Sequence, residues 1–327
     1  MRKSAQRGRW VAVFRYILLR ILWLLVSLAA VVALIYLICS MAMLTIWSPY
    51  TEFGDDIVTA FDNLRMYLLM IVTEWDWGVT RNGEPVWELV AYRMPRSLML
   101  MALSLLFYIL FGMVLGMIGA LRQSKPSDLV IRAFTMTFSS LPGFVLIIPL
   151  ILFFGFELDL LPRWYPHAGE LHERALAYVI PVLAVSGPPL AQMTQSLRNE
   201  LIDTMDADYM LMARTKGLNK RQAVFRHGFK NAIISVLPHI PGFFSFAVMN
   251  SFVVEQMYGM RGMASLLLSV MYRASFGGYF QIDIPITVAL ASFYVALAFV
   301  AAMLVDIVNS ALDPSMRFGG KKTSLDV

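Results

Sequence analysis

Charged side chains are scarce in this sequence. Only 15% of its 327 residues are charged and 58% are apolar, whereas soluble chains carry about 25% charged residues. The single cysteine, Cys39, lies within an apolar run, so no disulfide can form inside the chain. The composition therefore excludes a soluble globular protein and predicts an all-α, polytopic membrane protein.

Motifs for chemistry on small molecules are also missing. The sequence contains no Gly-x-x-x-x-Gly-Lys-Ser/Thr phosphate loop, no His-Glu-x-x-His zinc helix and no Gly-x-Ser-x-Gly nucleophile elbow. Carboxylates are nearly absent from the apolar runs, unlike in ion-driven pumps, which use them as relays. We therefore predict a non-catalytic chain with no cofactor of its own, whose energy comes from a partner.

The four histidines support neither a metal site nor an intramembrane protease. None lies in the middle of an apolar run beside a plausible partner. His167 and His172 share a short loop with Glu170 and Glu173, but without the spacing of a structural zinc site. We predict no metal there.

Six apolar runs are long enough to cross a bilayer, which takes about 20 residues. The first is too long for the apolar region of a signal peptide, so we expect a retained span. The six runs cover residues 21–47, 98–121, 133–156, 176–197, 234–254 and 282–308. The predicted organisation is a basic N-terminus (1–20), a first span (21–47), an outer segment (48–96), a core of five spans (97–310) with a polar loop (199–233), and a tail (311–327).

Positive charge is distributed as a membrane topology requires. With both termini cytoplasmic, 19 of the 27 lysine and arginine residues lie on the cytoplasmic side, in agreement with the positive-inside rule. The net charge of +5 therefore indicates orientation in a lipid membrane and not binding to nucleic acid. In the outer segment, apolar residues at helical spacing between Ile57 and Ile71 predict an amphipathic helix near the outer membrane face.

The polar loop between the fourth and fifth runs predicts two short helices around a break. Asp206 is placed to cap the first helix, and Met210, Leu211 and Ala213 to form its apolar side. Gly217 is placed to end this helix in the left-handed conformation that a Cβ disfavours.

The second helix of the loop is predicted to start at Asn219, with Gln222 three residues later as in a capping box. It then runs toward Pro238 and into the membrane. On spacing alone, the loop is also consistent with a basic cytoplasmic segment held near anionic lipid headgroups.

The loop residues resemble the cytoplasmic EAA loop of ABC importer permeases, in the version of the oligopeptide/dipeptide/nickel family. The matching residues are Asp208-Tyr209, Ala213-Arg214-Thr215-Lys216-Gly217-Leu218, Phe225-Arg226-His227, Asn231-Ala232 and Leu237-Pro238. The resemblance extends from about Trp75 to a C-terminal signature ending at Arg317. Arg261 stands where a proline is common in the family.

This resemblance implies a B-type permease subunit of a type I ABC importer in the bacterial plasma (inner) membrane. Its partners would be a second homologous permease subunit, two cytosolic ATPases that bind the ATP, and an extracytoplasmic solute-binding protein. The first loop helix would sit in a groove on an ATPase, through the residues Asp208, Tyr209, Ala213, Arg214, Lys216 and Gly217. Peptides are the expected cargo, with nickel chelates, sugars and antimicrobial peptides as alternatives, and an ion-driven secondary transporter as a distant one.

Three polar residues are candidates for a gate or a solute pathway. Gln192 and Gln195 lie in a run interrupted by prolines, where a broken helix would serve a pathway, with hydrogen bonding between helices as the alternative explanation. Glu255 ends the fifth run, either as a gate-lining carboxylate or as an interface residue that reaches water. Pro142 is expected to kink the third span, which either lines a pore or packs as a bent helix.

Overall fold

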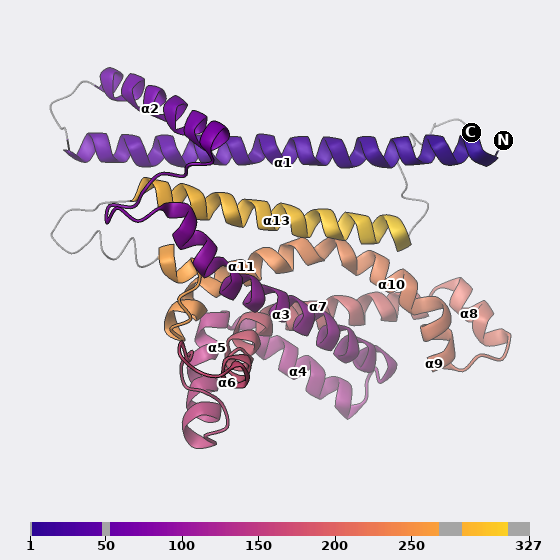
Figure 1. Ribbon diagram of the computed structural model, residues 1–327. Coiled ribbons are helices and arrows are strands. Elements are labelled where there is room, and N and C mark those ends of the chain that lie inside the picture. The colour runs from indigo at the N-terminus through magenta and orange to yellow at the C-terminus, as the bar shows by residue number, and fades with distance from the viewer. Residues whose placement is uncertain (1, 48–52, 268–282, 313–327) are drawn as a thin grey trace.

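The computed structural model describes residues 2–47, 53–267 and 283–312, which contain helices and no strand. Figure 1 shows the long helices in two groups, with the N-terminal helix alongside the C-terminal one. The helices are α1 (Arg2–Trp47), α2 (Phe53–Glu74), α3 (Val86–Leu121), α4 (Pro126–Ser140), α5 (Gly143–Leu150), α6 (Leu171–Leu176), α7 (Val179–Met205), α8 (Asp208–Thr215), α9 (Lys220–Ala223), α10 (Phe229–Val236), α11 (Ile240–Met257) and α13 (Ile284–Leu312). Residues 313–327, which include most of the predicted tail and of the C-terminal signature, lie outside the described residues.

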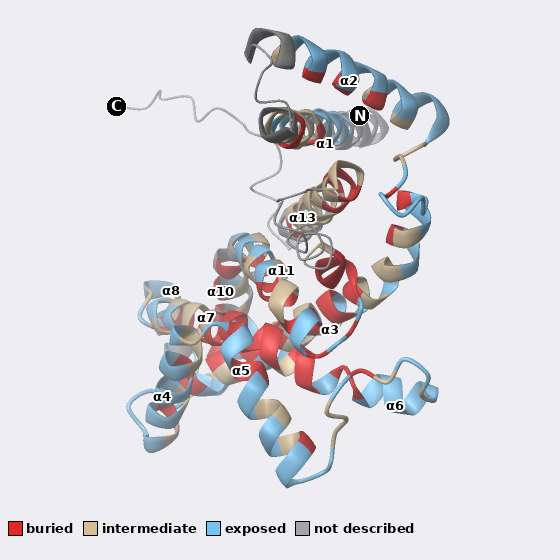
Figure 2. Cartoon of the chain, turned by 90° about the vertical axis from the view of Figure 1, so that its left-hand side faces the viewer, coloured by how far each residue is buried: buried red, intermediate tan, exposed pale blue. Residues whose placement is uncertain are grey.

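The helix α7 forms the centre of the core (Figure 2). It packs against α3, α4, α5, α10 and α11. Its closest neighbour is α3, whose Gly112, Gly116 and Gly119 face it. A Cβ on Gly116 would lie 2.9 Å from the Thr194 carbonyl oxygen, so only a glycine lets the two backbones approach this closely. The glycine stripe therefore serves packing inside the chain.

A second layer consists of α1, α2 and α13. The helix α1 lies along α13, where Arg20 forms an ion pair with Asp306. As predicted, 57–71 is helical, within α2, and it packs on α1 through Tyr67, whose ring stacks on Tyr36 at 5.0 Å. On the same helix Leu64 is buried, whereas Val58 stays exposed.

The third predicted span is divided by a sharp bend. The helices α4 and α5 meet at 109°, because Pro142 disfavours a helical conformation at Leu141, whose ψ is 127°. Beyond the break, the Gly143 N–H donates to the Asn250 side-chain oxygen at 2.8 Å, so the corner is fixed to α11.

The fourth predicted span, in contrast, is not broken at its prolines. The helix α7 continues through Pro188 and Pro189, so the predicted break is wrong. Each proline removes one backbone hydrogen bond, here the bonds to the carbonyls of Ala184 and Val185. The Ala184 carbonyl instead faces Gly143, where an added Cβ would lie 2.7 Å from it. Close packing against α5 thus keeps the helix continuous.

The number of spans agrees only in part with the prediction of six. Among the described residues, four helices are long and apolar enough to cross a membrane, or five if the bent pair of α4 and α5–η1 (η1, Ile151–Glu157) counts as one span. The fifth predicted span is divided into α10, a 3-10 turn at Leu237–His239, and α11. The all-α, polytopic class is confirmed.

Candidate functional site

The loop after α7 folds as two short helices, α8 and α9, as predicted. Gly217 follows α8 with φ +89°, which confirms its left-handed conformation. A Cβ added to Gly217 would meet no atom within 4 Å. Glycine is therefore required there for its backbone conformation and not for space.

The start of α9 has the predicted capping box. The Gln222 N–H donates to Asn219 Oδ1 at 2.9 Å, and the Asn219 N–H donates to Gln222 Oε1 at 3.2 Å. The cap predicted for α8 is wrong. Because α7 runs on to Met205, Asp206 closes that helix, and α8 begins only at Asp208.

The two faces of α8 differ in burial. Met210 and Ala213 are buried in a cluster with α7, α9 and α10. Leu211, predicted on the same apolar side, is instead 53% exposed, and its neighbour Met212 is 60% exposed. The inner face thus fixes α8 to the core, whereas the outer face presents two large apolar side chains to the surroundings.

A hydrogen bond joins the two halves of the loop. Asn231 Nδ2 in α10 donates to the Tyr209 hydroxyl in α8 at 3.0 Å. Both residues belong to the sequence motif, which the fold therefore brings together. Asp208 and Lys216 are exposed, and the Arg214 side chain lies outside the described residues.

An open hollow lies between the residues that follow α8, the helix α9 and the segment after α9. It is lined by Leu218, Gln222, Phe225 and Arg226. Phe225 is 58% exposed, so a third large apolar side chain is accessible in an otherwise polar loop. The segment that carries it, the π-helix η2 (Val224–Gly228), contacts α8.

Gln192 and Gln195 are half-buried on α7, toward its cytoplasmic half under the predicted topology. Spacings of three and four residues place Gln192, Gln195, Asn199 and Asp203 on one side of the helix. The exposed Asn199 and Asp203 continue this polar stripe toward the α8 loop. A pathway role for the two glutamines stays a prediction.

Glu255 does not reach water, contrary to one of its two predicted roles, because it is 0% exposed. The Ser97 hydroxyl donates to its Oε1 at 2.6 Å, and the N–H groups of Ala264 and Ser265 donate to its Oε2 at 3.0 and 3.3 Å. The Met263 N–H donates to Ser97 Oγ at 2.8 Å.

These contacts cap a helical turn. Residues 263–267 are helical, and the first N–H groups of a helix have no partner within it. Glu255 and Ser97, from two other helices, accept three of them. Gly262 has no room for a side chain, since a Cβ would lie 2.4 Å from Glu255 Oε2. The gate role of Glu255 remains untested by this geometry.

No group of three metal-ligating side chains occurs within the part of the chain that the structure describes. In the loop with His167 and His172, Glu170 and Glu173 instead form the capping box of α6.

A family model described as "Binding-protein-dependent transport system inner membrane component" matches residues 109–318. The chain belongs to this family. Among its relatives, the oligopeptide transport system permease protein AppB of Bacillus subtilis is 25% identical, over 76% of this chain and 78% of the relative. The dipeptide transport system permease protein DppB of Lactococcus lactis is 26% identical, over 72% and 73%, and the oligopeptide permease OppB of Salmonella typhimurium is 29% identical, over 71% and 72%.

This permease also has site residues that the sequence did not reveal. Asp128 and Arg198 pair at the corner of α3, α4 and α7, close to the loop. Ser97 and Asn250 hold distant backbone groups. A weak signal existed for Asp128, which lies in the first turn of a helix after Lys125-Pro126, but its partner is 70 residues away.

Proposed function

We propose that this ABC importer permease carries peptides across the bacterial inner membrane and is driven by cytosolic ATPases that bind α8. The observation that carries this proposal is the outer face of α8, where Leu211 and Met212 are exposed on a helix whose inner face is fixed to the core. Large apolar side chains exposed together on a polar loop are typical of a protein interface.

The contacts on the inner face of α8 transmit a movement of this helix to α7 and α10. A movement of α8 displaces Met210, which packs against α7 and against Gly228 at the end of η2. It also pulls on α10 through the bond between Tyr209 and Asn231. Both α7 and α10 lead into the membrane, so a rigid shift of α8 reorients them together, as alternating access requires.

The relatives' names support the choice of cargo. They are oligopeptide, dipeptide and glutathione permeases, so a short peptide is the first substrate to test, before nickel chelates, sugars and antimicrobial peptides. In this arrangement both termini are cytoplasmic. A second permease subunit completes the pathway, two ATPase subunits bind ATP, and a solute-binding protein delivers cargo from outside.

The experiment compares the double variant Leu211→Asp/Met212→Asp with Leu171→Asp. Leu171 is 84% exposed in α6, on the opposite side of the membrane under the predicted topology. We expect the double variant to insert normally but to lose both ATPase copurification and uptake of a labelled tripeptide, while Leu171→Asp retains both. Wild-type uptake without nucleotide, or full ATPase binding by the double variant, would overturn the proposal.

A further inference from the structure

Three arginines converge at the end of α3 that is remote from the α8 loop. Arg93 and Arg96 lie on successive turns of α3, and Arg261 lies in the turn after α11. Arg96 Nη1 donates to the Arg261 carbonyl oxygen at 3.4 Å. The charges of all three are close enough to interact. Arg96 also lies over the ring of Tyr92, 4.7 Å from its centroid.

This arginine cluster (Arg93, Arg96 and Arg261) is only partly neutralised. Glu84 and the buried Glu255 lie near Arg93. Among the described residues, however, no carboxylate forms an ion pair with any of the three. Burial, and then the positive charges of Arg261 and Arg96, hold the pKa of His167 below its usual range. Among the described residues, the cluster therefore presents positive charge that no ion pair neutralises.

The backbone of Arg261 is strained. Its φ is +49°, a left-handed conformation that costs a residue with a Cβ about 1 kcal/mol relative to glycine. A strained residue indicates function when its side chain supplies something that glycine cannot. At this position, the side chain supplies an exposed positive charge beside Arg96.

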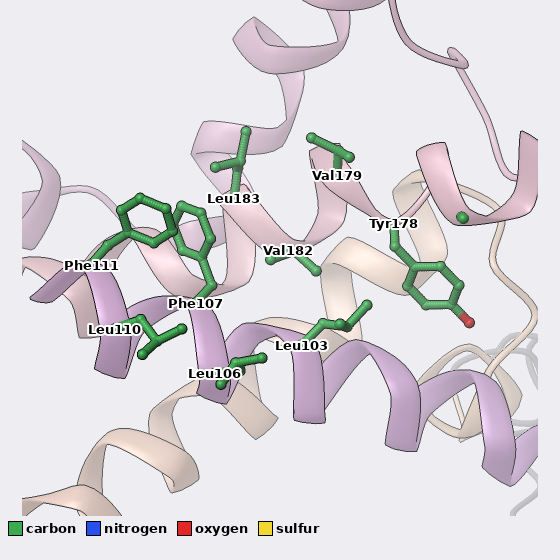
Figure 3. A pocket seen from close by; sticks show the side chains of 10 residues that line it. Leu103, Leu106, Phe107, Leu110, Phe111, Tyr178, Val179, Val182 and Leu183 are labelled. Atoms are coloured by element: carbon green, nitrogen blue, oxygen red, sulfur yellow. The ribbon is translucent and has the colours of Figure 1, made fainter. Parts of the chain in front are cut away.

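An apolar groove of about 390 Å³ lies between α3 and the start of α7. Tyr178, which lines the groove, is close enough to Arg96 of the cluster to interact with its charge. Figure 3 shows its two walls facing each other. They are formed by Leu103, Leu106, Phe107, Leu110 and Phe111 on one side, and by Ala175, Tyr178, Val179, Val182 and Leu183 on the other. The Tyr178 hydroxyl is the one polar side-chain group among these ten residues.

The cluster and the groove share one face of α3. Arg96, Leu103, Phe107 and Leu110 follow one another at intervals of seven, four and three residues, which keeps them on one side of a helix. The stretch from Leu103 to Phe111 spans about 12 Å of helix, close to the roughly 15 Å of one hydrocarbon leaflet. Tyr92 continues this face beyond Arg96, where aromatic side chains mark the membrane interface.

We propose that the arginine cluster and the groove together bind one anionic phospholipid. Its phosphate lies on Arg96 and Arg261, and one acyl chain follows the groove along α3. A peptide fits less well, because its backbone needs hydrogen-bond partners that leucine, valine and phenylalanine cannot provide. An acyl chain needs none. This proposal does not depend on whether α8 binds an ATPase.

The test measures lipid retention by native mass spectrometry on the full-length chain in detergent. The probes are phosphatidylglycerol and phosphatidylethanolamine with identical acyl chains, and glycerol 3-phosphate, which has none. Arg96→Gln/Arg261→Gln should lower phosphatidylglycerol retention about tenfold, since guanidinium–phosphate bonds are charge-assisted. Arg65→Gln, an exposed arginine on α2, should change nothing.

Two further variants separate binding from folding. Arg261→Gly removes the charge and relieves the strained backbone, so it should lose lipid without losing thermal stability. Leu106→Trp fills the groove and should lose phosphatidylglycerol, whereas Val114→Trp, also exposed on α3 but outside the groove, should retain it.

Four results would overturn the proposal. The first is equal retention of both phospholipids in all variants, and the second is binding of glycerol 3-phosphate as tight as that of the lipid. The third is occupancy of the site by an apolar tripeptide in place of phosphatidylglycerol, which would assign the groove to cargo. The fourth is loss of the lipid when the second permease subunit assembles, which would make the groove a subunit interface.

Discussion

Arg198 holds Asp128 through two parallel hydrogen bonds. Its Nε donates to Oδ1 at 2.7 Å and its Nη2 to Oδ2 at 2.9 Å. The Asp128 side chain is fully buried, and its Oδ2 also accepts from the Ser124 N–H at 3.1 Å. The pair ties the start of α4 to α7 about two helical turns before α7 ends at Met205, so it anchors the base from which α8 projects.

Replacement of Asp128 by asparagine should destabilise the protein by about 2–4 kcal/mol, because it leaves a partly buried guanidinium without its charge partner. The measurement is the midpoint of thermal unfolding in detergent. Asp159→Asn is the control, since Asp159 pairs with Arg163 at 3.1 Å on the surface with 79% of its side chain exposed. Exposed pairs contribute little, so equal shifts in the two variants would contradict this account.

The end of α8 allows a test of conformation without a change in packing. Gly217→Val should abolish solute uptake while the chain still inserts, because a β-branched residue does not adopt φ +89°. Gly217→Asn should retain most of the uptake, because asparagine tolerates this region. Neither side chain meets a neighbour near Cβ, so loss of uptake in both variants alike would point to a requirement other than backbone conformation.

The sequence predicted the parts of the loop that depend on local chemistry. The left-handed conformation of Gly217 and the capping box of Asn219 and Gln222 depend only on residues three or four positions away in the sequence. Both predictions are confirmed. The prediction that Asp206 caps α8 is wrong for a reason that lies outside the local sequence. The length of α7 is set by packing against α3 and α10, and this carries the helix up to the residue that was expected to start the next one.

The partners of the buried polar groups could not be predicted. Glu255 and Ser97 are 158 residues apart in sequence, and no local pattern places them together. The same applies to Pro142 and Pro188. Both prolines predict a break, but only the first one occurs, because dense packing around α7 outweighs the hydrogen bond that Pro188 removes.

The glycines of α3 should differ in their tolerance of alanine. A Cβ on Gly116 would meet the Thr194 carbonyl oxygen at 2.9 Å and Leu197 Cβ at 3.1 Å, whereas one on Gly119 would meet only outer atoms of the Arg198 side chain, the nearest being Cδ at 3.1 Å. A long side chain can change its rotamer, but a helix backbone must move as a unit. Gly116→Ala should therefore lower the thermal midpoint clearly more than Gly119→Ala, and the reverse order would contradict a close backbone contact at Gly116.

The cap built by Glu255 and Ser97 gives the last prediction. Gly262→Ala places a Cβ 2.4 Å from Glu255 Oε2 and 2.5 Å from Ser97 Oγ, which forces both groups away from the N–H groups they hold. Each buried donor left without a partner costs about 1–3 kcal/mol, so the thermal midpoint should fall steeply. Gly242→Ala in α11 meets no atom within 4 Å and should be neutral or stabilising, since alanine favours a helix by about 1 kcal/mol.

Ser97→Ala tests the same cap without a steric clash, because it leaves the Met263 N–H unpaired. If Ser97→Ala and Gly262→Ala both unfold like the wild type, the contacts of Glu255 do not stabilise the helical turn, and a role in gating becomes the better explanation for a buried carboxylate at this position.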